Sequence, residues 1–125
     1  MQSRPTTLHP AFWSTIDAAH RDTKKLRRLI DPMSRAELLA FYRDFIYAAG
    51  RLRKQPFDDE ESDGNYERSW WVVAQGSATY DDVLAHPEKM PDDTSGPGLE
   101  FPGVIARVFA ERFGMEVMEA DMREP

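Results

Sequence analysis

The stretch SDGNYERSWWVVAQGSATY, residues 62–80, decides the fold of this chain. Tyr66, Trp70 and Val73 recur at spacings of four and three, so they share one face of a helix. Gly76 follows directly and predicts the end of that helix, because glycine readily adopts the backbone conformation that ends one. A helix this apolar needs partners on more than one side, so we expect it to be the centre of the fold.

The length and composition indicate one domain. A chain of 125 residues buries enough surface to form a core without cross-links. The sequence has no cysteine, which excludes disulfides and thiolate metal sites and fits a reducing compartment. No apolar run approaches the roughly 18 residues of a membrane span. We expect a cytoplasmic protein with a flexible arm at 1–10, a single helical domain at 11–114 and a helical extension or tail at 115–125.

Two longer helices are expected before the central one. Apolar residues at helical spacing predict the first over residues 11–30, which ends before Pro32. Ser34 and Glu37 form the pattern of a capping box, in which each side chain accepts a hydrogen bond from the backbone amide of the other residue. This pattern predicts the start of the second helix. Because the connection between these helices is short, we expect them to form an antiparallel hairpin.

Two further helices are expected after Gly76. Residues 80–85 form a short helix capped by Ser77 or Thr79, and residues 88–101 look like a long loop rich in glycine and proline. The last helix covers about residues 103–120, with Gly114 bending or ending it. The pattern as a whole predicts an all-α protein, a compact bundle of about five helices.

A set of motifs between Phe12 and Pro87 carries a resemblance to a known family that covers residues 12 to about 113. They are Phe12-Trp13 followed by Ile16-Asp17, Ser34-x-x-Glu37-Leu38, Ser62-Asp63-Gly64-x-Tyr66 with Arg68 and Trp71, Gln75-Gly76, Tyr80, and Val83-Leu84 leading to Pro87. With them the chain resembles a bacterial family without an assigned activity, the domain-of-unknown-function family 4240. Val72 and Val73 stand where that family more often has leucine and isoleucine. The resemblance implies a compact helical domain and supplies no catalytic residue.

Metal binding has little support in the sequence. The acidic residues before the central helix match several positions of a calcium-binding loop, but Trp70 occupies the twelfth position, where a bidentate glutamate is required. His9, His20 and His86 lie far apart and lack the spacing of a zinc site. We expect no metal and no other cofactor.

A polar pocket between the first and the central helix is one functional alternative. Its candidate residues are Asp17, Arg68, Gln75 and Tyr80. Asp17 would need a partner if it faces the core, and Arg68 is the one expected, either in a site or in a structural ion pair that fixes two helices in register. No nucleotide-binding or nucleophile motif accompanies these residues, so an enzyme is the less favoured reading.

Protein binding is the favoured hypothesis. A net charge of −6 argues against nucleic acid as a partner, and the cations gather at helix ends, where they complement helix dipoles in any case. Acidic and aromatic residues next to the central helix suit protein recognition instead, and the candidates are Asp59, Glu60, Glu61, Asp63 and Trp71. We therefore expect a non-catalytic interaction module, immunity-like or antitoxin-like, that binds an unidentified protein.

Overall fold

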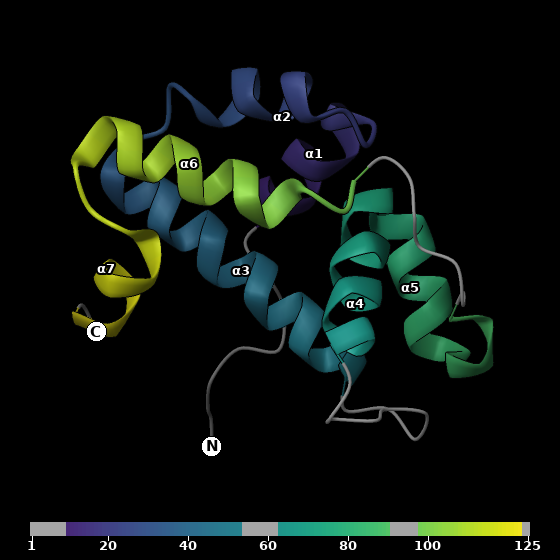
Figure 1. Cartoon of the computed structure of the whole chain (residues 1–125). Helices are drawn as coiled ribbons and strands as arrows, with labels where there is room; N and C mark the ends of the chain where they lie inside the picture. Colours follow the sequence, from purple (N-terminus) through teal and green to yellow (C-terminus); the bar gives the residue numbers. More distant parts are fainter. Residues whose placement is uncertain (1–9, 54–62, 91–97, 124–125) are drawn as a thin grey trace.

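Figure 1 shows the computed structural model, which describes residues 10–53, 63–90 and 98–123. These residues form seven α-helices and one short 3-10 helix, with no strand among them. In chain order the elements are α1 Pro10–Ala19, α2 Thr23–Ile30, α3 Arg35–Arg53, α4 Asp63–Gln75, α5 Ser77–Ala85, the 3-10 helix η1 Pro87–Lys89, α6 Phe101–Phe113 and α7 Val117–Arg123. The expected all-α class is confirmed, whereas the expected count of about five helices is too low.

The long helix α3 packs against α1, α4, α5, α6 and α7 (Figure 1). Helix α6 lies between α2 and α3, in contact with both. Helices α4 and α5 form an antiparallel pair at the C-terminal end of α3, and α7 packs near its N-terminal half. The helix that the sequence predicted to be central, α4, therefore lies at one end of the molecule, and the predicted position is wrong.

The core is built around large aromatic side chains from α1, α3 and α6. The largest fully buried ones are Phe12, Phe45, Phe101 and Phe109. The ring of Phe12 lies 5.1 Å from that of Phe41 and 6.3 Å from that of Phe45, which joins α1 to α3. Burying a side chain of this size contributes about 1.5–3 kcal/mol, so these contacts fix the position of α1.

The prediction of one continuous helix over residues 11–30 is wrong, because the helix is interrupted between α1 and α2. His20 and Arg21 have left-handed φ angles of 50° and 63°, which no α-helix accommodates. The Asp22 carboxylate then accepts hydrogen bonds from the amides of Lys24 and Lys25, at 2.8 and 3.3 Å. These bonds cap the first turn of α2 and so stabilise a new helix start immediately after the break.

The expected hairpin of the first two helices is also replaced by a different packing. Helix α2 packs mainly against α1 and α6, while α3 packs mainly against α4 and α6. The break rotates the second half of the expected helix away from α3 and lays it along α6 (Figure 1). Its buried residues, Leu26 and Ile30, contribute to the common core.

Two predicted helix boundaries are confirmed. The amide of Ser34 donates to Glu37 Oε1 at 2.8 Å and the amide of Glu37 donates to Ser34 Oγ at 3.1 Å, which is the capping box predicted for α3. Gly114 ends α6 with a left-handed φ of 72°. Residues 103–120 are therefore divided between α6 and α7.

Helix α7 falls in the segment expected as an extension or tail. Val117 and Ala120 are buried, and Arg43 Nε of α3 donates to Asp121 Oδ1 at 2.6 Å. Met118 and Met122 point outward and are 65% and 83% exposed. The helix η1, which begins at Pro87 two residues after α5 ends at Ala85, reaches into the segment 88–101 that was expected to be a loop. No helix in the described ranges combines the length and the apolar character that crossing a membrane requires.

The cap at Asp22 predicts a specific response to acid. The hydrogen bonds from the amides of Lys25 and Lys24 lower the Asp22 pKa below its usual 3.8. Its contribution to stability is therefore present above that value and lost as the pH falls through the lowered folded-state pKa. Asp22→Asn retains a capping oxygen but does not titrate, so urea unfolding midpoints measured across this range should fall less with acid for this variant than for wild type. Parallel curves for the two proteins would contradict the prediction.

Candidate functional site

The predicted site residue Asp17 lies where α1, α4 and α5 meet. Its Oδ1 accepts a hydrogen bond from the Ser77 amide at 2.9 Å, and its Oδ2 accepts one from Ser77 Oγ at 2.9 Å. Ser77 is the first residue of α5, whose own N-cap residue, Gly76, has no side chain to offer. Asp17 therefore caps α5 from another helix, and its carboxylate complements the positive end of the helix dipole.

Gly76 is required at this junction for two reasons. Its φ of +117° is one that L side chains rarely adopt, and a Cβ added to it would lie 2.8 Å from Asp17 Oδ1. The predicted end of the central helix at Gly76 is thus confirmed, while the cap predicted from Ser77 or Thr79 comes instead from Asp17. A contact between residues 60 positions apart leaves no local signal in the sequence.

Gln75 joins the same junction. Its Nε2 donates to the Trp71 carbonyl at 3.2 Å, and its Oε1 accepts from Arg21 NH1 at 3.4 Å. The second bond ties the break between α1 and α2 to the end of α4. The structure thus brings Asp17 and Gln75 to one junction and adds Arg21 and Ser77, which the sequence interpretation did not select for this site.

Tyr80 is placed differently, in the core. It is 3% exposed, and its hydroxyl donates to the Ala48 carbonyl of α3 at 2.9 Å. Its ring lies 4.9 Å from the ring of Trp13. Burial raises the pKa of Tyr80 to about 12. These contacts anchor α5 to α3 and α1, and they engage the hydroxyl that the pocket hypothesis assigned to a ligand.

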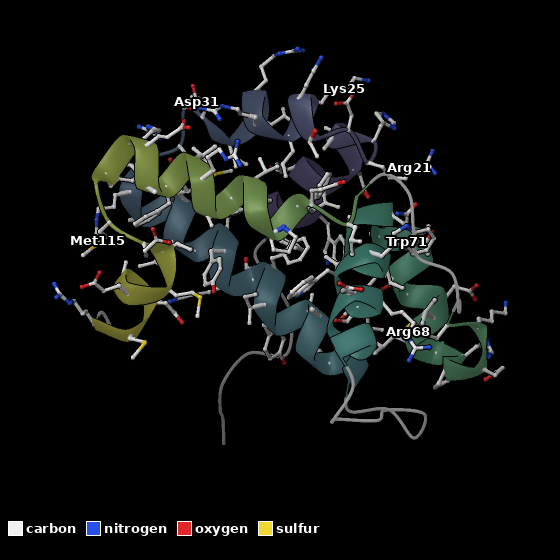
Figure 2. All side chains as sticks on the ribbon, in the orientation of Figure 1. Arg21, Lys25, Asp31, Arg68, Trp71 and Met115 are labelled. Atoms are coloured by element: carbon white, nitrogen blue, oxygen red, sulfur yellow. The ribbon has the colours of Figure 1, made fainter. Side chains whose placement is uncertain are left out.

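Arg68 and Trp71 lie one turn apart on α4, on the same side of the helix (Figure 2). Both are half-buried. The expected pairing of Arg68 with Asp17 does not appear among the contacts of Asp17, whose two carboxylate oxygens are both bonded to Ser77. The ion pair expected between these two helices is replaced by the helix cap.

The acidic candidates Asp59, Glu60 and Glu61 lie outside the described residues, and Asp63 is described only as the first residue of α4. The structure adds exposed acids on the neighbouring elements, namely Glu67 of α4, Asp81 and Asp82 of α5, and Glu88 of η1. Asp82 pairs with Lys89 at 3.2 Å. Glu67 and Asp81 have no ion-pair partner among the described residues. Neither was among the predicted binding residues: Glu67 lies one turn before Trp71 on α4, and the position of Asp81 beside α4 depends on α5 packing against that helix.

Within residues 10–53, 63–90 and 98–123, no three side chains of the types that bind metals come together.

Comparison with known proteins adds no identification, since neither the family models, nor the curated proteins, nor the solved structures contain a match for the chain. The resemblance to the domain-of-unknown-function family 4240 stays a prediction.

The junction predicts a coupled pair of stability effects. Asp17→Ala should lower the free energy of unfolding by about 1 kcal/mol through loss of the cap. Gly76→Ala should cost about 1–3 kcal/mol, because it combines backbone strain with a clash against Asp17. In the Asp17→Ala background the clash is gone and only the strain remains, so Gly76→Ala should cost less there. Urea unfolding of the four proteins of this double-mutant cycle measures the coupling, and strictly additive effects would contradict the contact.

Tyr80 predicts a response to alkali. Its folded-state pKa of about 12 exceeds the usual value of 10.0, so its contribution to stability is full below pH 10 and is lost as the pH rises toward 12. Tyr80→Phe should lower the free energy of unfolding by about 1–3 kcal/mol at neutral pH, because the Ala48 carbonyl loses its donor. An ultraviolet titration of tyrosinate should show the last ionisation step in wild type and not in the variant. An unchanged titration would assign that step to another tyrosine.

Proposed function

We propose that this protein is a non-catalytic interaction module that binds a basic surface of a partner protein through the acidic and aromatic face of α4 and α5. The observation that carries the proposal is the presence of two exposed carboxylates without an ion-pair partner among the described residues, Glu67 and Asp81, on the helix pair that contains half-buried Trp71. Carboxylates left unneutralised on a surface attract cations of a partner and raise the association rate.

The acidic stretch before α4 extends this face in the proposal. Asp59, Glu60, Glu61 and Asp63 precede or begin the helix that carries Glu67, so the chain concentrates negative charge at this end. Trp71 supplies the aromatic component that protein interfaces favour. An immunity-like or antitoxin-like protein, which neutralises a basic partner in the cytoplasm, is one form of this function.

The alternative of a small-molecule pocket has weaker support from the geometry. Asp17 and Gln75 do come together, but their polar atoms are engaged in holding α1, α4 and α5 to one another. The hydroxyl of Tyr80 is bonded to the backbone of α3. These bonds give Asp17, Gln75 and Tyr80 a structural role, which leaves less reason to assign them to a ligand. The contacts therefore favour the interaction module.

The proposal predicts how capture of a partner depends on position and not only on charge. Two variants test this dependence in affinity capture from native lysate, analysed by mass spectrometry. One carries Glu67→Gln and Asp81→Asn, and the other carries Asp59→Ser, Glu60→Ser and Glu61→Ser. Each should lose a stoichiometric partner that wild type captures. Their melting temperatures should stay close to that of wild type, because exposed unpaired charges contribute little to stability.

The matched control is the protein carrying Asp31→Asn and Glu116→Gln. It removes two exposed acids, as the first variant does, from elements outside α4 and α5. It should retain the partner. Equal capture by all four proteins, or equal loss in the control, would reject this face as the binding surface.

A further inference from the structure

An open groove of about 660 Å³ lies between α2 and α6. Lys24 and Arg27 line it from α2, and Gly103 and Arg107 line it from α6, with Glu100 at the start of α6. The two helices run side by side in the same direction (Figure 1), so the first turns of both lie at the same end of the groove. This face is separate from the acidic face of α4 and α5.

The groove continues into a neighbouring hollow of about 360 Å³. Thr23 and Glu100 line both, while His20 and Arg21 belong to the hollow alone. The left-handed residues His20 and Arg21 therefore sit in the wall of the same depression. The break that separates α1 from α2 is what places these side chains next to the start of α6.

Positive charge dominates the lining. Lys24, Arg27 and Arg107 face the groove, and Arg21 faces the hollow. Arg27 pairs with Glu111 of α6. Lys24 and Arg107 have no side-chain hydrogen bond or ion pair with any residue that the structure describes. Cations gathered from two helices repel one another, and an anion between them would relieve that repulsion.

Two acids also line the depression, and they differ in role. The Asp22 carboxylate is occupied by the amides of Lys24 and Lys25, which it caps. Glu100 makes no side-chain cap to α6. Glu100 is therefore the one acidic side chain in the described lining that is open to repel an incoming anion. Its removal should strengthen anion binding, whereas removal of a cation should weaken it.

We propose that this groove binds a small phosphate-bearing molecule. Its volume falls in the range of about 300–1,000 Å³ that is usual for ligand sites. Lysine and arginine are the side chains that bind phosphate through charge-assisted hydrogen bonds. Gly103 presents no side chain, and the position of its missing Cβ has no atom within 4 Å, so a ligand can approach the backbone of α6 there.

A small ligand fits better than a nucleic-acid strand. The chain as a whole carries a net charge of −6, which repels an extended polyanion, whereas one or two phosphates respond mainly to the charges in the groove. Val104 adds an apolar wall beside the cations. The groove thus offers both charge for a phosphate and apolar surface for the rest of a molecule.

The test is a calorimetric titration with inorganic pyrophosphate at constant ionic strength. The variant with Lys24→Gln and Arg107→Gln should bind about tenfold more weakly than wild type, since it loses both unpaired cations of the lining. The control with Lys25→Gln and Arg28→Gln removes the same charge from α2 outside the lining, and it should stay within about twofold of wild type. Figure 2 shows Lys25 on the outer side of α2, away from α6.

The Glu100→Gln variant should change pyrophosphate affinity in the opposite direction. Removing this carboxylate should strengthen pyrophosphate binding by about threefold to tenfold, because it removes a repulsion close to the ligand. Circular dichroism of each variant checks that the helices are intact. Failure of wild type to bind pyrophosphate, or equal weakening by the two double variants, would overturn the proposal. A single-stranded oligonucleotide that binds more tightly than pyrophosphate and weakens equally in both double variants would also overturn it and assign the basic face to nucleic acid.

Discussion

The left-handed turn at His20 and Arg21 is the constraint on which the rest of the arrangement depends. Each non-glycine residue in this conformation costs about 1–2 kcal/mol. The cost is offset by what the turn permits, since α2 lies along α6 and buries Leu26 and Ile30 completely.

Local signals in the sequence predicted much of the helical structure. Ser34 and Glu37 marked the start of α3, and Gly76 and Gly114 marked helix ends, because each acts through hydrogen bonds or φ angles of its immediate neighbours. Leu38, Phe45 and Leu52 recur at intervals of seven along α3, a helical spacing, and all three are fully buried. Features whose cause lies within one turn of a helix are the ones that a single sequence reveals.

The break between α1 and α2 escaped prediction for a physical reason. Ile16, Leu26 and Ile30 keep helical spacing across it, so the apolar pattern reads as one helix. The left-handed residues are histidine and arginine, which carry no turn signal comparable to that of glycine or asparagine. Asp22 in front of a basic helical run was the one available sign, because aspartate is a favoured N-cap.

For the candidate site, the sequence identified some of the residues but not the contacts they make. Asp17 and Gln75 proved to share a junction, yet Asp17 bonds to Ser77, 60 positions away in the chain, and Gln75 bonds to Arg21, 54 positions away. Tyr80 was selected for its hydroxyl, and packing against Trp13 and Ala48 places that hydroxyl in the core. Long-range contacts of this kind depend on how the helices are oriented relative to one another, and no local pattern in the sequence encodes that orientation.

The same junction also links the depression beside α2 and α6 to α4. Arg21, in the wall of that depression, donates to Gln75 at the end of α4, the helix that carries Glu67 and Trp71. Gly98, just before α6, packs so closely on this end of α4 that a Cβ there would lie 2.9 Å from that of Ala74. The starts of α2 and α6 are thus both fixed against α4. Because Asp17 of α1 also caps α5 at this point, the end of α4 is where α1, α2, α5 and α6 are connected to one another.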